Sequence, residues 1–343
     1  MKTTLHIILL SSLLWMVSCS DSLTPDRSGN IAIAADVNSL GVEVKSAAVP
    51  FEGISKSTPL NARLMCSFTP GVYMNDPQEP WFIPCHTNVT FESGDLTFVK
   101  YAKDQNVNLN LTYPTPADAS EDENDEITEN VYCVGMYPNS GWSVAADGKS
   151  ATHPINGSDD LMFADQVVGT WDRHFPAQKY AHLQTWVTIL VSANTIDAAV
   201  QWGKIKEVTI KSADAVTINF PTTANGKSTI DYPGTKQIEV FSSNTGQDLN
   251  ITTFEIGSVF MVPAVYQKNG LTLSVTVKTT TFPEGKTVEG IKLLNENNVQ
   301  ITDISEIIGK VFVINLNFNP LSIIEGVCTL HYWNDQDEDI YLQ

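Results

Sequence analysis

Apolar residues occupy every second position in most hydrophobic stretches of this 343-residue sequence. The two clearest stretches place on one face Leu271, Leu273, Val275 and Val277, and then Phe312, Ile314, Leu316 and Phe318. This alternation is typical of half-buried antiparallel strands, because successive side chains of a strand point to opposite faces. Valine, isoleucine, threonine and aromatic residues fill these stretches, as strands favour. The pattern therefore predicts an all-β fold.

Short clusters of turn-forming residues separate the predicted strands. They include Asn225-Gly226, Pro233-Gly234, Asn269-Gly270 and Pro283-Glu284-Gly285. Many short strands with turns at near-regular spacing indicate an antiparallel sandwich or barrel. One short helix is expected over residues 195–202, where Ile196, Ala199 and Val200 share a side, but it is too short to change the fold class.

The chain is long enough for two domains of roughly 100–200 residues each. A break is expected near residues 169–172, because prolines interrupt the apolar runs before it and longer, more regular strands follow it. We therefore expect an N-terminal β-sandwich domain over residues 31–172 and a C-terminal β-sandwich domain over residues 173–343.

The first 18 residues have the features of a secretory signal peptide. A basic Lys2, an apolar run over residues 5–15 and a small Ser18 precede Cys19. The cysteine directly after the predicted cut resembles a lipoprotein signal, in which the new N-terminal cysteine is acylated, although Met16 stands where leucine is usual. The alternatives are an ordinary cleaved signal or a membrane span; the run of about 11 residues is short against the roughly 20 that a spanning helix needs. Residues 19–30 are polar and are expected to form a tether.

Charge and cysteine content limit the possible partners. The formal net charge is −19 and no basic patch occurs, which argues against a nucleic-acid partner. Four cysteines remain beyond Cys19, and none of them forms a CxxC pair: Cys66, Cys85, Cys133 and Cys328. In an exported chain they are open to one or two disulfides, while their apolar surroundings are equally typical of buried free thiols.

The sequence carries no motif that indicates catalysis. Its six histidines are isolated, and no HExxH, GxSxG elbow or Walker loop is present. The acidic stretches at 118–129 and 335–339 lack the glycine of a calcium loop and read as solvated loops. The tryptophans are widely spread, although two exposed coplanar rings would make a glycan platform. We expect no enzyme activity, no metal site and no cofactor.

Several short motifs follow one another in an order that resembles a known family. They are YPNSGW (137–142), INGSDDLMFA (155–164), LQTWVTIL (183–190), WGKIKEVTI (202–210), VFMVPA (259–264) and a final segment over 324–335. Together with the lipoprotein-like signal, this succession resembles the fimbrillin-like lipoproteins, which are subunits of type V pili. The resemblance covers most of the chain from about residue 130 onward.

The resemblance implies two transthyretin-like (Ig-like) antiparallel β-sandwich domains in tandem. It implies a lipid-anchored protein of the outer membrane and cell surface, acylated at Cys19, that serves as a structural subunit or tip adhesin. In stalk subunits a trypsin-like protease removes the first strand, and a strand from another subunit fills the groove; anchor subunits escape cleavage. The expected partners are other pilus subunits, the outer membrane and a host or bacterial surface ligand. The alternative function is a surface glycan-binding lipoprotein.

The resemblance also selects candidate residues. The displaceable strand is expected over residues 31–37, with Ile31, Ile33, Ala35 and Val37. The candidate cleavage residues are Arg63, Lys45 and Lys56, and Arg63 is equally consistent with a plain surface charge. The candidate donor is the C-terminal segment. Residues 326–333 are instead expected to close the second sandwich as its last strand, which leaves residues 334–343 as the more mobile piece.

Overall fold

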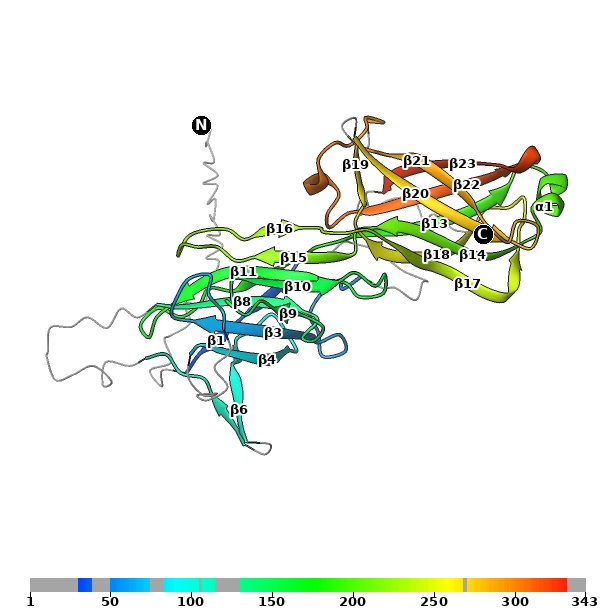
Figure 1. Cartoon of the computed structure of the whole chain (residues 1–343). Helices are drawn as coiled ribbons and strands as arrows, with labels where there is room; N and C mark the ends of the chain where they lie inside the picture. Colours follow the sequence, from blue (N-terminus) through cyan, green and yellow to red (C-terminus); the bar gives the residue numbers. More distant parts are fainter. Residues whose placement is uncertain are drawn as a thin grey trace, which may run out of the picture.

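The computed structural model describes residues 30–38, 50–74, 83–104, 107–114, 130–267, 270–295 and 297–331. Strands dominate this part of the chain, and the helical pieces within it are short: α1 (Ile196–Trp202), η2 (Ile304–Glu306) and η3 (Pro320–Ser322). The predicted all-β fold is confirmed. Figure 1 shows the strands gathered into two β-rich bodies, an N-terminal one and a C-terminal one. None of the helices in the described residues is long and apolar enough to cross a membrane.

A six-stranded sheet is the centre of the N-terminal body. Its strands lie in the order β2 (Ala35–Val37), β12 (Gln178–His182), β11 (Met162–Gly169), β8 (Val131–Tyr137), β3 (Leu60–Ser67) and β4 (Cys85–Phe91). All neighbours are antiparallel except β2 and β12, which run parallel. The domain boundary expected at residues 172 and 173 falls between β11 and β12, which are neighbours in this sheet.

Both faces of the six-stranded sheet are covered. In β3, Leu64 and Cys66 belong to one hydrophobic core, whereas Met65 between them belongs to another. The first six residues of β8 are therefore all buried, although the sequence pattern predicts half-buried strands. Continuous apolar runs such as residues 131–134 are what a strand covered on both faces requires.

Two smaller sheets cover the two faces of the six-stranded sheet. On one side lies a four-stranded sheet in the order β16 (Thr229–Asp231), β15 (Ala215–Asn219), β10 (Ser150–Pro154) and β9 (Ser143–Val144). The other core includes the short pair β1 (Ala32–Ile33) and β5 (Thr97–Phe98). A hairpin of β6 (Lys100–Asp104) and β7 (Val107–Asn110) follows β5.

The hairpin β15–β16 joins the two bodies. In the sequence this hairpin lies between two strands of the C-terminal body, but its strand β15 pairs with β10 of the N-terminal body (Figure 1). A β-carbon at Gly71, whose φ is +70°, would lie 1.8 Å from the carbonyl oxygen of Pro221 next to β15. Only glycine fits such a close approach with a positive φ. One hydrophobic core then continues from Met65 in β3 to Phe312 in the C-terminal body.

The C-terminal body is a sandwich of nine strands. Their order is β17 (Lys236–Asp248), β14 (Lys204–Ser212), β20 (Gly270–Thr279), β21 (Lys286–Leu294), β23 (Ile323–His331), β22 (Val311–Asn319), β13 (Thr185–Ala193) and β18 (Phe254–Met261), while β19 (Val265–Gln267) pairs with β20. Only two residue pairs, starting at Leu293 and Cys328, join β21 to β23. The alternating apolar residues of β20 and β22 are all buried, as the sequence predicts.

Candidate functional site: the leading strand and its groove

The leading strand, residues 30–38, takes part in two sheets of the N-terminal body: β1 pairs with β5, and β2 pairs with β12. Its first half lies between two segments of the outer layer, because the Ile31 N–H donates to Leu111 O (2.7 Å) and Val99 N–H donates to Ile31 O (2.9 Å). Its second half is an edge strand of the six-stranded sheet, where the N–H of Gln178 donates to Ala34 O (2.8 Å). The leading strand therefore completes the hydrogen bonding of two sheets at once.

The side chains of the leading strand fill the core between these layers. Ile31 and Ile33 are fully buried, Ala35 is 2 % exposed and Val37 is half-buried. They share one hydrophobic cluster with residues of the six-stranded sheet, among them Leu60, Leu64, Phe91, Met162 and Tyr180. Burial of each isoleucine side chain stabilises the docked strand by about 1.5–3 kcal/mol. Without this strand the cluster would be an apolar groove with unpaired backbone groups along both walls.

The connection between the leading strand and β3 contacts one buried ion pair twice, at Asn38 and again at Phe51. Nδ1 of His182 lies 2.8 Å from Oδ1 of Asp160, and Nε2 lies 2.8 Å from the carbonyl oxygen of Asn38. The second carboxylate oxygen of Asp160 accepts a hydrogen bond of 2.8 Å from the backbone N–H of Phe51. Each ring nitrogen faces an acceptor, and this arrangement favours the doubly protonated imidazolium. These four residues, Asn38, Phe51, Asp160 and His182, are called the clasp below.

The charges of the clasp stabilise one another. Burial opposes the positive charge of His182, but its hydrogen bond and ion pair with Asp160, with smaller contributions from Asn38 O and Glu52, raise the pKa of His182 above its usual value. Removing one partner from a buried ion pair typically costs about 3–5 kcal/mol. The clasp therefore fixes the point where the leading strand ends and the point where the chain returns.

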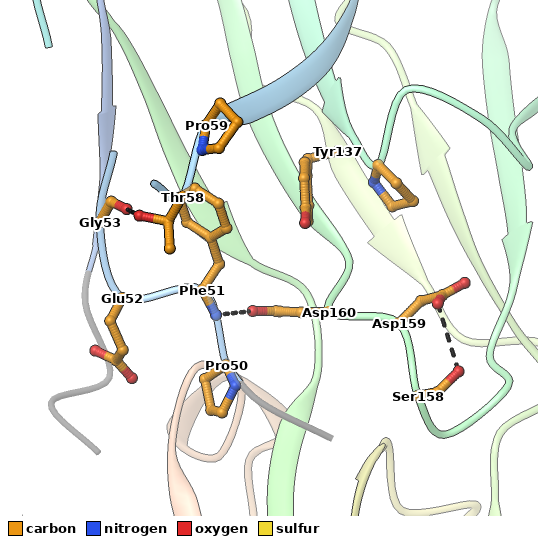
Figure 2. A pocket seen from close by; sticks show the side chains of 11 residues that line it. Pro50, Phe51, Glu52, Gly53, Thr58, Pro59, Tyr137, Ser158, Asp159 and Asp160 are labelled. Atoms are coloured by element: carbon orange, nitrogen blue, oxygen red, sulfur yellow. Dashed lines mark hydrogen bonds between the residues drawn. The ribbon is translucent and has the colours of Figure 1, made fainter. Parts of the chain in front are cut away.

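Figure 2 shows the returning segment against the end of the six-stranded sheet. Residues 50–59 border an open cleft of about 520 Å³, and the rings of Phe51 and Tyr137 lie 5.3 Å apart at its wall. The hydroxyl of Thr58 donates to Gly53 O (3.1 Å) and closes a turn in this segment. Within the described residues, no group of three or more His, Cys, Asp or Glu side chains is placed to hold a metal ion.

The candidate cleavage residues lie in different environments. Lys56 is exposed at the turn of the returning segment, after the leading strand and before β3. Arg63 lies inside β3, which pairs with β4 on one side and β8 on the other. Its guanidinium donates to Trp142 O (3.3 Å), and burial lowers the pKa of Arg63. Lys45 and Cys19 lie outside the described residues.

The C-terminal strand β23 closes the second sandwich. It pairs with β22 over its whole length, from Ile323 to His331. The expectation that this segment is the last strand of its own sandwich is thereby confirmed up to His331. The proposed mobile tail, residues 334–343, lies outside the described residues.

The tryptophans of the described residues do not form an exposed pair. Trp142, Trp186 and Trp202 are buried, and Trp171 is half-buried. No pair of exposed tryptophans therefore offers a platform for sugar rings in the part of the chain that the structure describes. Trp81 and Trp333 lie outside that part.

The sequence reasoning missed the clasp. It counted His182 only as one of six isolated histidines, and it did not single out Asp160. A signal was present in β12, where Gln178, Tyr180 and His182 alternate with exposed residues and thus share the inward face. An inward histidine at the end of a strand requires a buried polar partner.

The sequence matches no protein-family model and no curated protein significantly. Similar solved structures include a "putative cell adhesion protein" from Bacteroides uniformis (15% identity, TM-score 0.47, 90% of this chain and 99% of the other covered). They also include "putative polysaccharide binding proteins" from Bacteroides thetaiotaomicron (6%, TM-score 0.47, 89% and 98%). A third is the fimbrial anchor protein Mfa2 from Porphyromonas gingivalis (9%, TM-score 0.41, 89% and 97%).

Proposed function

We propose that this protein is a structural subunit or tip adhesin of a cell-surface pilus, without enzymatic activity. In this proposal a protease removes the leading strand, and a strand of another copy replaces it. The observation that carries the proposal is the course of residues 30–38, which complete two sheets and are held without any covalent bond apart from the chain itself. The exposed Lys56 follows in the same connection, so that one cut there separates the strand from the fold.

Removal of the leading strand would leave a site suited to a second strand. The edge of β12 would regain unpaired backbone groups, and the pockets of Ile31 and Ile33 would open to water. An incoming extended segment satisfies the backbone groups, while its alternate side chains fill the pockets. We propose the tail beyond β23 as the incoming segment, because β23 itself is fully engaged with β22 and Ile340, Tyr341 and Leu342 are apolar.

Limited proteolysis of the purified precursor tests this function. We expect a lysine-specific protease to cut in the connection at Lys56 or Lys45 and to produce ladders of oligomers on unheated denaturing gels. An arginine-specific protease should produce no ladder in the same time. Arg63 lies within a strand paired on both sides, and cleavage at Arg27 or Arg173 leaves the leading strand joined to β3.

A Lys45→Gln, Lys56→Gln double variant is the matched control, since Lys56 is exposed and its substitution leaves the core intact. This variant should stay monomeric under the same treatment. A wild-type protein that is fully cut in the connection yet remains monomeric would contradict strand exchange.

Membrane attachment is a separate part of the proposal. We propose that Cys19 is acylated after removal of residues 1–18, because it directly follows a segment with the features of a secretory signal. The acyl chain would hold the protein at the membrane, since each buried methylene contributes about 0.8 kcal/mol to membrane binding. Cys19→Ala is expected to release the protein from the membrane fraction, whereas Ser20→Ala should not. Cell fractionation with labelled fatty acid measures both properties, and a Cys19→Ala protein that stays labelled and membrane-bound would refute the anchor.

A further inference from the structure

Three cysteines form a row across three neighbouring strands of the six-stranded sheet. Cys66 in β3 is directly opposite Cys85 in β4 and directly opposite Cys133 in β8. Residues directly opposite each other in an antiparallel pair point to the same face. All three thiols therefore lie in the core that the leading strand completes, and they are 0 %, 2 % and 1 % exposed, respectively.

The spacing within this row permits either of two alternative disulfides, Cys66–Cys85 or Cys66–Cys133. It excludes a bond between Cys85 and Cys133. Opposed residues of antiparallel strands have Cα atoms about 4.5–5.5 Å apart, inside the range of about 4.4–6.8 Å that a disulfide spans. The pKa of the Cys66 thiol responds to both Cys133 and Cys85, as expected for side chains that share one face of the sheet. Cys85 and Cys133 are two strands apart, about 10 Å, which is too far for a bond.

We propose that this row is a redox site in which Cys66 forms a cross-strand disulfide with either Cys85 or Cys133, while the third cysteine stays a thiol. The reaction partner is a disulfide reagent, R–S–S–R, of the kind that oxidises thiols in an exported protein. Cys66 and its partner lose two protons and two electrons, one S–S bond forms between them, and the reagent is reduced to two R–SH molecules.

The third thiol allows the bond to change partners within the row. With Cys66 bonded to Cys85, the thiolate of Cys133 attacks the sulfur of Cys66, and Cys85 leaves as a thiolate that takes up the proton. No net oxidation occurs in this step. The site thus holds one disulfide in two alternative positions, one joining β3 to β4 and the other joining β3 to β8.

The closed core slows both reactions. The neighbouring Cys133 side chain, together with burial, raises the pKa of Cys66 well above its usual value against an opposing effect of Cys85. The hydrogen bond with Cys66 and burial likewise raise the pKa of Cys85. Exchange requires a thiolate, so we expect it during folding or when the core opens. Gln178 connects the row to the leading strand, since its side-chain amide lies 3.6 Å from Sγ of Cys133 and its backbone N–H binds Ala34 O.

Peptide mapping after oxidation tests the proposal independently of strand exchange. The full chain carrying Cys19→Ala is refolded with oxidised glutathione, its remaining thiols are alkylated, and its disulfide-linked peptides are identified by mass spectrometry. We expect one disulfide per chain that always contains Cys66, with the loss of two hydrogen atoms and with Cys328 reduced. A Cys85–Cys133 bond, a bond to Cys328, or a chain without any disulfide would overturn the proposal.

Single substitutions separate the two pairings. Cys85→Ser should give only the Cys66–Cys133 bond, and Cys133→Ser should give only the Cys66–Cys85 bond. Cys66→Ser should give none, although two thiols of the row remain. Both of the first two variants retain Cys66, so a folding defect in Cys66→Ser does not weaken the test.

Discussion

An aspartate in place of Ile33 is expected to expel the leading strand from its groove. Ile33 is fully buried in the core of the N-terminal body. Loss of such a side chain costs about 2–5 kcal/mol, and an unpaired carboxylate in the same place adds several kcal/mol more. This total cost exceeds the stabilisation of about 1.5–3 kcal/mol that Ile31, the other fully buried isoleucine of the strand, still provides in the variant. The strand should therefore leave rather than bury the charge.

Hydrogen exchange followed by mass spectrometry measures this release. In Ile33→Asp we expect faster exchange at the amides that pair with the strand, namely those of Val99 and Gln178, while β20 and β22 of the C-terminal body stay protected. Ile33→Val should cost only about 0.5–1.5 kcal/mol and keep the strand docked. Asp36→Asn, at an exposed position of the same strand, should behave like the wild type. Unchanged exchange at these amides in Ile33→Asp would refute a separately displaceable strand.

Asparagine in place of Asp160 is expected to weaken the clasp by about 3–5 kcal/mol, the usual cost of breaking a buried ion pair. The substitution keeps the shape of the side chain but leaves the imidazolium of His182 without its counter-charge. Chemical denaturation at pH 6 measures the loss. Asp159→Asn is the matched control, because Asp159 precedes Asp160 and accepts hydrogen bonds only from Asn156 and Ser158 among the contacts described.

The same ion pair predicts a dependence on pH. The pKa of His182 is raised in the folded protein, so the charged form stabilises the fold fully below the unfolded value of about 6.5. This stabilisation is lost as the pH rises through the higher folded-state pKa. His182→Gln should remove that part of the pH dependence. Subtracting the pH profile of His182→Gln from that of the wild type leaves the contribution of His182 alone. The contribution of His86 has the opposite sign, because burial lowers its pKa, and it is the same in both proteins. Identical pH profiles would contradict a charged clasp.

Local patterns in the sequence predicted the positions of strands and of the helix better than they predicted which strands pair with each other. Alternation identified the buried faces of β20 and β22, because the period of a strand is visible in any short stretch. The helix over residues 195–202 is also present, and Thr195 caps it. The side shared by Ile196 and Val200 is exposed, whereas Trp202 is buried. The large ring of Trp202 packs on Phe282 and Phe318, and this distant contact decides which side faces inward.

Pairing between distant strands has no local signature. The parallel alignment of β2 with β12 joins residues 35–37 to residues 178–180. Neither stretch contains a sequence pattern that predicts the other as its partner. The clasp was invisible for the same reason, because Asp160 and His182 meet only after β11 and β12 have paired. The candidate strand over residues 31–37 was placed from resemblance, and the structure then assigned its two halves to different layers.

The hairpin β15–β16 makes the two halves of the sequence interdependent in evolution as well as in folding. A recombination event that replaced residues 183–343 would carry away two strands of the sheet that contains β10 and would graft an unpaired hairpin onto its new host. Such chimeras lose two of the four strands of that sheet and gain an exposed edge at the same time. Descendants of this chain should therefore inherit the two bodies together, as one exchangeable unit.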